Sequence, residues 1–442
     1  MAIDLTKGSP AKAIFLYSLP IILGNVFQQV YNLVDMVIVG RMVNYQALAG
    51  LGITGGTTFF AMGFVFGITG GSGIMVAQYF GARNAEGLRK AVGMSIILSA
   101  VLALILTVGM VAGTEPLLRL IGTGDEIYPY ARDYLKVLFA GIVTQTAYNL
   151  VACILRGLGD SRTPLYFLIF SSLLNVGLDI AFIGGFGWGV KGAAYATLAA
   201  QAISAILCFI FAFIHYPEIR IKAEHLRIDW KEIGEQLRIG VPMALQFSIT
   251  AAGIIMLQAA LNAFPATYIA GFSAANKVQN VGSLVAISFG VAMANYAGQN
   301  FGAGDIPRVR KGVKVTVLMT LAVSVVAGSL MAALADPLTS LFLEPGISNP
   351  EIYYASRRYI YMSALFFPFL YVIFVYRNAL QGIGKTFLPL MAGVLELLIR
   401  AVGSATLPRF WGYTGITFID VSAWIGASVM LFISYRIQMP KK

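Results

Sequence analysis

The chain has 442 residues, of which 58% are hydrophobic and 12% are charged, and its mean hydropathy is +0.78. This composition excludes an ordinary soluble globular domain and is typical of a protein with many membrane spans. The formal net charge is +11, but the basic residues are scattered over short connections between apolar segments. Positive-inside bias therefore explains the charge better than binding to nucleic acid does.

Twelve apolar segments are separated by charged or Gly/Pro-rich breaks, which predicts an all-α polytopic membrane protein with twelve transmembrane helices. Their approximate cores are residues 13–39, 47–77, 91–112, 132–154, 164–184, 189–214, 236–262, 267–297, 313–335, 352–380, 386–408 and 412–435. Residues 1–8 lack the pattern of a signal peptide, so we expect the first helix to be retained.

The distribution of Lys and Arg predicts the orientation of these spans. Twenty of the 31 basic residues lie at the termini or in the even-numbered connections, whereas eight lie on the opposite side. Both termini are therefore predicted to be cytoplasmic, in a multi-pass protein of the inner or plasma membrane. The two cysteines lie in apolar segments and the two histidines flank one loop, so neither a metal site nor a cofactor is expected.

The two halves of the chain repeat. Pro20 matches Pro242, the segment starting at Gln78 (QYFGARNAEGLRKAV) matches the one starting at Gln299 (QNFGAGDIPRVRKGV), and RGLGDSRTPL matches QGIGKTFLPL. The displacements are 222, 221 and 225 residues. The predicted organisation is an N-lobe (1–215), a cytoplasmic inter-lobe loop (216–235) and a C-lobe (236–442), with the two six-helix lobes related by a pseudo-twofold axis along the membrane normal.

The first span carries an unusual polar stripe. Asn25, Gln28, Gln29, Asn32 and Asp35 follow one another at steps of one, three and four residues, so they share one side of a helix. A carboxylate inside a span is costly, and it marks an ion or proton pathway by default. The amides of the stripe are compatible either with hydrogen bonds between helices or with a cavity lining.

Three polar residues on later spans can reach the level of Asp35. At 1.5 Å per residue, Asp35 lies roughly 30 Å along its span and Asp179 about 22 Å along the fifth, which also rises outward. Asn175 lies one turn before Asp179, and Thr197 lies about 12 Å below the outer end of the sixth span. Two carboxylates, an amide oxygen and a hydroxyl can coordinate Na⁺ or hold one or two protons, and the residues do not decide between these ions.

Together these features resemble the multidrug and toxic compound extrusion (MATE) family, and within it the DinF-like branch. The resemblance covers essentially the whole chain. It implies an antiporter with two lobes around a central cavity that exports cationic or amphipathic compounds against an H⁺ or Na⁺ gradient. It also implies a cation site at Asp35, Asn175, Asp179 and Thr197, and a role for Pro20 in bending the first helix.

The C-terminal half departs from the NorM-like branch of that family, in which the seventh and tenth spans carry acids. Here FSITAAGIIMLQAAL and FPFLYVIFVYRNAL contain none, and the repeat maps Asp35 onto Leu257. The cation site is therefore predicted in the N-lobe alone. Glu396 and Arg400 are one turn apart near mid-membrane, and they are interpreted either as a structural ion pair or as cavity residues, with Arg377 and Lys277 as alternative partners of Glu396.

The sequence thus predicts a secondary multidrug efflux transporter that alternates access between two lobes and acts as a monomer on small organic molecules in the bilayer. The expected cavity lining is Gln28, Asn32, Asn149, Gln246, Glu396 and Arg400. The alternative is a flippase for a lipid-linked saccharide or lipid precursor, supported by Arg377, Arg400 and Lys277. A membrane-embedded enzyme is disfavoured, because no HExxH motif or nucleophile elbow is present.

Overall fold

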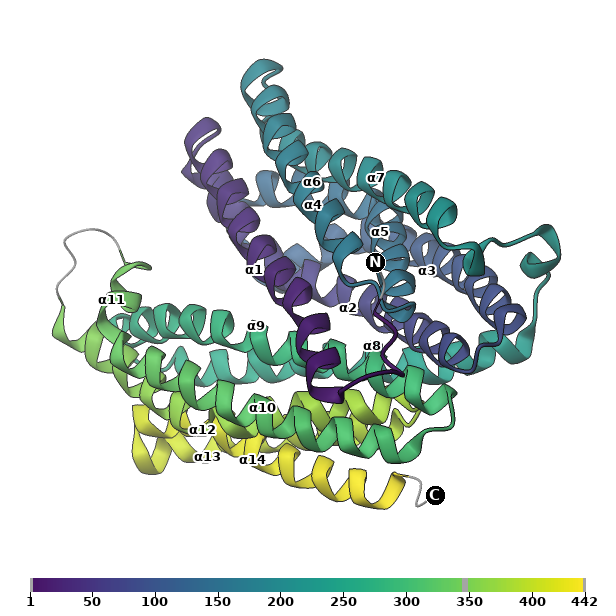
Figure 1. Cartoon of the computed structure of the whole chain (residues 1–442). Coiled ribbons are helices and arrows are strands. Elements are labelled where there is room, and N and C mark those ends of the chain that lie inside the picture. Colours follow the sequence, from purple (N-terminus) through teal and green to yellow (C-terminus); the bar gives the residue numbers. More distant parts are fainter. Residues whose placement is uncertain (1–2, 344–348, 440–442) are drawn as a thin grey trace. The chain divides into compact units, whose positions relative to one another are not determined.

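A computed structural model describes residues 3–343 and 349–439, and helices dominate these two ranges (Figure 1). Eleven of the described helices are long and apolar enough to cross a membrane, and a bent pair makes a twelfth. The helices are α1 (Pro10–Met42), α2 (Tyr45–Gly81), α3 (Ala85–Leu120), α4 (Tyr128–Ala140), α5 (Ile142–Gly157), α6 (Arg162–Asp179), η1 (Ile180–Gly185), α7 (Gly189–His215), η2 (Pro217–Ile219), η3 (Ala223–Leu226), α8 (Trp230–Leu261), α9 (Ala266–Gly302), α10 (Ile306–Ala333), α11 (Ala335–Ser340), α12 (Pro350–Gly382), α13 (Phe387–Trp411) and α14 (Tyr413–Gln438). The prediction of an all-α polytopic protein is confirmed.

The fourth predicted span, residues 132–154, is not one continuous helix. It is built from α4 and α5, which meet at Gly141 with a bend of 52°. A side chain at Gly141 would meet the methyl groups of Leu198 on α7, since a Cβ there would lie 2.3 Å from them. The break therefore lets this span pass close to α7, one residue from Thr197.

The chain forms two compact units, and the division falls inside helices. Unit 1 comprises Met1–Asp4 and Leu23–Phe247, and unit 2 comprises Leu5–Ile22 and Ser248–Lys442. The division thus passes through α1 just after Pro20 and through α8 shortly after Pro242. The predicted inter-lobe loop also differs in extent, because α8 already begins at Trp230. The lobe boundaries at residues 215 and 236 remain a prediction.

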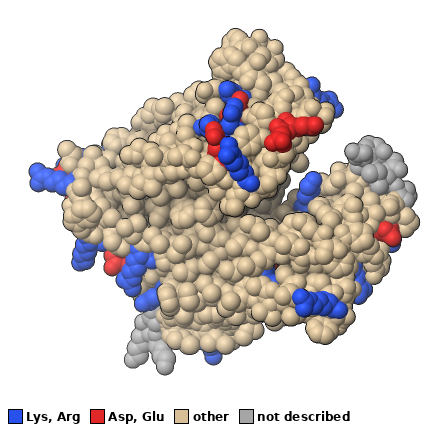
Figure 2. Space-filling model, turned by 180° about the vertical axis from the view of Figure 1, so that it is seen from behind, with Lys and Arg blue, Asp and Glu red and all other residues tan. Residues whose placement is uncertain are grey.

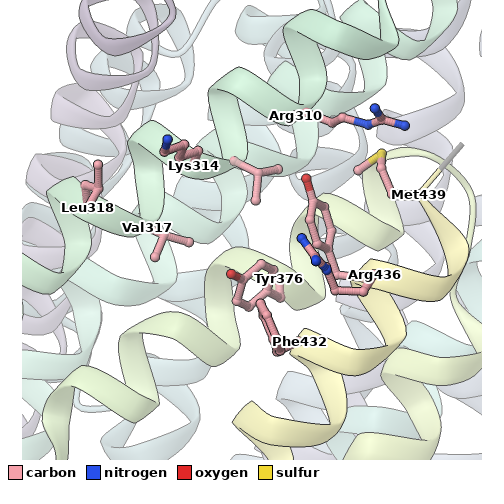
Figure 3. Close-up of a pocket in the computed structure, with 10 residues that line it drawn as sticks. Arg310, Lys314, Val317, Leu318, Tyr376, Phe432, Arg436 and Met439 are labelled. Atoms are coloured by element: carbon pink, nitrogen blue, oxygen red, sulfur yellow. The ribbon is translucent and has the colours of Figure 1, made fainter. Parts of the chain in front are cut away.

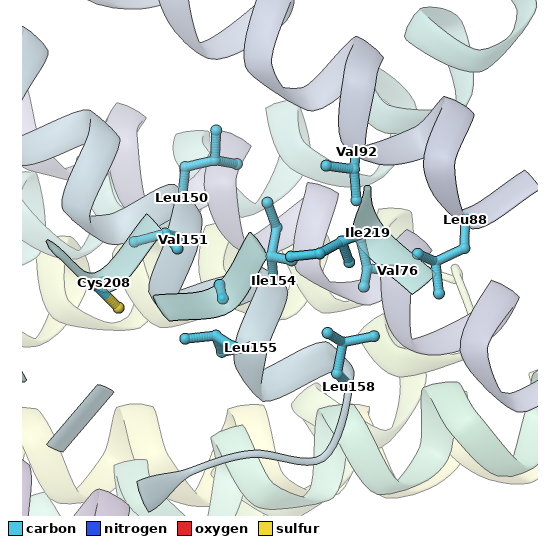
Figure 4. Close-up of a cluster of buried hydrophobic side chains, with 11 residues drawn as sticks. Val76, Leu88, Val92, Leu150, Val151, Ile154, Leu155, Leu158, Cys208 and Ile219 are labelled. Atoms are coloured by element: carbon cyan, nitrogen blue, oxygen red, sulfur yellow. The ribbon is translucent and has the colours of Figure 1, made fainter. Parts of the chain in front are cut away.

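The core of unit 1 brings together α2, α3, α5 and α7 with the connection that follows α7. Figure 4 shows one cluster of this core, in which Leu150, Ile154 and Leu158 of the α5 segment meet Val92 of α3 and Ile219 of η2. The connection between α7 and α8 is therefore packed onto the helices. At the same end, Tyr79 donates a 2.9 Å hydrogen bond to Glu232 at the start of α8.

Close contact between α2 and α8 within unit 1 depends on glycine. A Cβ at Gly67 would lie 2.3 Å from the backbone nitrogen of Ala244, and one at Gly71 would lie 2.7 Å from the backbone of Gly240. Such small residues allow helix backbones to approach each other in a membrane. The glycine-rich segment starting at Gly63 was expected to permit close packing, and this is confirmed.

Unit 2 is built from α9 to α14, with the first part of α1. The segment before α1 is held to this unit by Arg308 of α10, whose guanidinium donates to the carbonyls of Lys7 (2.7 Å) and Gly8 (2.9 Å). Charged side chains are sparse on the face of the molecule shown in Figure 2, where broad areas carry none. Exposed apolar residues such as Leu104 and Ile105 of α3 fit a surface that contacts lipid.

Candidate functional site

Four polar residues that lie far apart in the sequence come together inside unit 1. Asp35 of α1, Asn175 and Asp179 of α6, and Thr197 of α7 are all buried, with exposed fractions of 8%, 1%, 0% and 8%. The carboxyl groups of Asp35 and Asp179 lie within hydrogen-bonding reach of each other. The structure therefore assembles the set of residues in which the sequence predicts a cation site.

The backbone changes its helical form directly after Asp179. The π-helical turn η1 begins at Ile180, and the backbone nitrogen of Phe186 donates a 2.9 Å hydrogen bond to the carbonyl of Ala181, five residues earlier. Gly187 then turns the chain into α7 with a φ of 70°. π-Helical turns are rare and often occur at functional sites. Here the turn holds Asp179 at a helix end and returns the chain so that Thr197 lies beside Asn175.

The amide of Asn175 links α6 to α7. In the orientation that gives partners to both amide atoms, its nitrogen donates to Asp179 Oδ2 (3.0 Å) and its oxygen accepts from the backbone nitrogen of Thr197 (3.0 Å). In the reverse orientation the nitrogen faces Thr197 Oγ1 at 3.3 Å. The first orientation is favoured because the second points the amide oxygen only at other acceptors.

Two tyrosines complete the cluster, and the sequence analysis missed both. The Tyr31 hydroxyl contacts the side chain of Thr197, and Tyr134 of α4 lies close to both carboxyls. Tyr31 is one helical turn before Asp35, so the periodicity that revealed the polar stripe also pointed to it. Tyr134 follows from no such signal, because its position depends on the break between α4 and α5.

The site has the chemistry of a place for one small cation or for protons. Two carboxylates in contact repel each other strongly at low dielectric constant, and a shared proton or bound cation removes that repulsion. One oxygen of each carboxyl, Oδ1, is buried without a hydrogen-bond partner among the described residues. The same residues contain no group of three His, Cys, Asp or Glu side chains able to hold a metal ion. Na⁺ would therefore depend on the Asn175 and Thr197 oxygens as well as on the carboxylates.

The other residues predicted to function in unit 1 or α1 lie in varied surroundings. α1 is continuous across Pro20, and Gln28 and Asn32 are exposed on the same helix. Asn149 is half-buried and donates a 2.9 Å hydrogen bond to the carbonyl of Gln145 one turn earlier, whereas Gln246 is buried. Their roles in bending and in cavity lining stay predictions.

Unit 2 contains a separate buried network of charged residues. Glu396 of α13 pairs with both Arg377 of α12 and Arg400, the latter at 3.4 Å. Arg400 Nε also contacts Asp420 of α14 at 2.9 Å. Two guanidinium groups and two carboxylates thus balance, and Asp420 is a member that the sequence analysis missed. Lys277 does not contact Glu396 but lies 5.4 Å from the centre of the Phe342 ring.

Gly253 of α8 makes room for this network. A Cβ at this position would lie 2.9 Å from Cδ of Arg400. Tyr359 of α12 adds a hydrogen bond of 3.1 Å from its hydroxyl to Asp420 Oδ2. The network therefore joins three helices of unit 2, and Glu396 and Arg400 are both paired, as the structural interpretation of these two residues requires. Whether they also line a cavity stays a prediction.

Many membrane-spanning helices in two units, with paired carboxyls buried in one of them, define a polytopic transporter. The MatE family profile matches residues 20–181 and 239–406, one stretch in each half of the chain. The chain belongs to the MatE family of multidrug and toxic compound extrusion transporters, and it is a transporter and not an enzyme. Members of this family act on small molecules and use ion gradients.

Relatives from several bacteria match over nearly the whole chain. "Probable multidrug resistance protein YpnP" of Bacillus subtilis is 27% identical, over 98% of this chain and 97% of its own. "Probable multidrug resistance protein NorM" of Thermotoga maritima is 25% identical, over 94% and 88%. A protein of Shewanella oneidensis described as "FAD transporter" is 22% identical, over 96% and 94%.

Solved structures share the fold. A multidrug resistance MATE family transporter of the MOP superfamily in an outward-facing conformation superposes with a TM-score of 0.91 at 23% identity, over 99% of this chain and 97% of its own. A MOP superfamily transporter from Pyrococcus furiosus gives the same TM-score at 22% identity and the same coverage. These likenesses confirm the two-lobe helical fold.

Proposed function

We propose that this protein is a cation-coupled antiporter that exports cationic or amphipathic organic compounds and binds its coupling ion, H⁺ or Na⁺, at Asp35, Asn175, Asp179 and Thr197. The observation that carries the proposal is the contact between the carboxyls of Asp35 and Asp179, which come from α1 and α6. A proton or Na⁺ entering this site stabilises the arrangement in which the two helices are close. Loss of the ion leaves two repelling carboxylates and favours their separation.

The ion drives export only if it binds the two conformations with different affinity. Moving an equilibrium from 1:99 to 99:1 takes a difference of about 10⁴-fold. α1 is suited to transmit the change, since Pro20 donates no backbone hydrogen bond and lets the helix bend in its first half. We place both termini in the cytoplasm, in the plasma membrane, and we assign the protein to the DinF-like branch, acting as a monomer.

Transport into proteoliposomes tests this proposal, with a pH gradient and a Na⁺ gradient imposed separately and a fluorescent organic cation as substrate. We expect one gradient to drive transport by the wild type. Asp35→Asn and Asp179→Asn should each abolish it while the protein stays folded. Asp125→Asn, which neutralises an exposed carboxylate between α3 and α4, is the matched control and should transport normally.

Substrate movement that ignores both gradients would contradict antiport and favour the flippase alternative. The structure offers that alternative little support, because Arg377 and Arg400 are already paired with Glu396 and Asp420. An FAD arm belongs in the same assay, because one relative is described as an FAD transporter. Export of FAD and not of organic cations would keep the coupling site but replace the proposed substrate class.

A further inference from the structure

A pocket of about 550 Å³ lies within unit 2 among α10, α12 and α14 (Figure 3). Ten described residues line it, of which three are cationic and none is acidic. The cations are Arg310, Lys314 and Arg436. The pocket shares no residue with the paired carboxyls of unit 1 or with the charged network around Glu396. Its charge therefore calls for a ligand of its own.

The pocket is cationic at one end and apolar at the other. Arg310 and Lys314 lie on successive turns near the start of α10, and Arg436 lies in the last turn of α14 (Figure 3). Further from these helix ends, the lining becomes apolar at Leu318 and Phe432, whose exposed fractions are 59% and 46%. Both helices are long and apolar enough to span a membrane. The polar end of the pocket thus lies toward the membrane surface and the apolar end toward the hydrocarbon.

Aromatic rings form a wall along this gradient. The Tyr376 ring of α12 lies 5.1 Å from the Tyr435 ring and 5.7 Å from the Phe432 ring, centre to centre. The Arg436 guanidinium lies 5.9 Å from the centre of the Phe432 ring. Tyrosines are favoured at membrane interfaces, because the ring packs on apolar groups while the hydroxyl bonds to polar ones.

We propose that this pocket is a binding site for an anionic phospholipid, in the leaflet on the side of the chain's C-terminus. The phosphate group lies among Arg310, Lys314 and Arg436, within reach of the tyrosine hydroxyls, and an acyl chain lies along Leu318 and Phe432. Basic pockets between membrane helices recognise anionic head groups in this way. A lipid with a zwitterionic head group leaves less net charge to balance the three cations, so it binds more weakly.

The test is lipid binding to the purified full-length protein by native mass spectrometry, with phosphatidylglycerol, phosphatidylcholine and soluble glycerol 3-phosphate as probes. We expect phosphatidylglycerol to bind in preference to the other two. The triple variant Arg310→Gln, Lys314→Gln, Arg436→Gln should lose at least about tenfold of that binding. The control Lys12→Gln, Lys311→Gln, Lys385→Gln removes three exposed cations of the same unit and should keep it.

Three results overturn the proposal: equal binding of phosphatidylglycerol and phosphatidylcholine, equal loss in the control variant, or binding of glycerol 3-phosphate as strong as that of the lipid. The last result indicates a free phosphate ligand instead of a lipid. A second measurement needs no variant. A photoactivatable phosphatidylglycerol should cross-link to peptides of α10 and α14 in the wild type, and cross-links confined to other helices contradict the site.

Discussion

Asp35 and Asp179 come from helices far apart in the sequence, and their contact makes the charge of each carboxyl depend on the other. The sequence could predict these two residues, Asn175 and Thr197, because a polar residue inside an apolar span is conspicuous and helical rise places it at a level. It could not predict Tyr134 in the same way. A tyrosine in an apolar span is ordinary, and only the break at Gly141 directs this one to the site.

Asp160, in the connection between α5 and α6, is the residue whose titration should be visible in stability. Its carboxylate accepts hydrogen bonds from Tyr216 Oη (2.6 Å), Thr163 Oγ1 (2.5 Å) and the backbone nitrogen of Arg162 (2.9 Å). Burial acts to raise the pKa of Asp160, but the hydrogen bonds from Thr163, Tyr216 and the backbone outweigh burial and lower it. The carboxylate thus joins the start of α6 to the end of α7.

The lowered pKa fixes the direction of the pH effect. The stabilisation by Asp160 is complete above the unfolded pKa of about 3.9 and is lost as the pH falls through the lower folded pKa. Tyr216→Phe removes one hydrogen bond to a charged group and should cost about 1.5–3 kcal/mol at pH 7. Thermal unfolding in detergent between pH 7 and pH 3 checks both points. An acid-induced loss of stability that is the same in Asp160→Asn as in the wild type would assign it to other groups.

Arg400 should matter for stability through the charges that it balances. Arg400→Met leaves Asp420 buried without its guanidinium partner, and breaking a buried pair typically costs about 3–5 kcal/mol. The double variant Arg400→Met, Asp420→Asn removes both charges and should recover much of the loss. Arg357→Met breaks an exposed pair with Asp336 and should cost about 1 kcal/mol or less. Unfolding temperatures compare the variants, and a double variant no more stable than Arg400→Met would refute charge balance as the reason.

At the scale of helices, the sequence indicated where most spans lie but not how they deviate from regular form. A glycine such as Gly141 fits equally well inside a continuous helix and at a break, and only the approach of α7 decides between the two. The π-helical turn after Asp179 is also invisible in the pattern of apolar residues. Asp420 escaped notice because a lone acid near the start of a span resembles an interfacial residue until Arg400 is placed beside it.

The contact of α2 with α8 should be sensitive to a single methyl group. In Gly67→Ala, the new Cβ would overlap the backbone of Ala244, which cannot move without separating the helices. Overpacking of this kind costs about 1–3 kcal/mol. Gly55→Ala is the control on the same helix, since a Cβ there meets no atom within 4 Å, and it should be neutral or stabilising. Equal unfolding temperatures for the two variants would show that the helices can separate at no cost.

For the whole molecule, the orientation in the membrane is open to direct measurement. After replacement of Cys153 and Cys208 by alanine, a cysteine at position 125 should react with an impermeant maleimide in intact cells. A cysteine at position 218 should react only after the membrane is opened, because the basic connections are expected on the cytoplasmic side. Both native residues, Asp125 and Glu218, are exposed in connections between spans. The reverse labelling pattern would invert the predicted topology.

The division of the two units inside α1 and α8 also bears on how such a chain arose and how it can be cut. A polypeptide that stops at the hydrophilic connection lacks the stretch of α8 whose Gly240 and Ala244 pack on α2. The remaining piece lacks Leu5–Gly8 and the first part of α1, to which Arg308 is bonded. Neither fragment is then a complete folding unit. If the repeat arose by gene duplication, the half-length ancestor must have assembled in pairs that exchanged these helical segments.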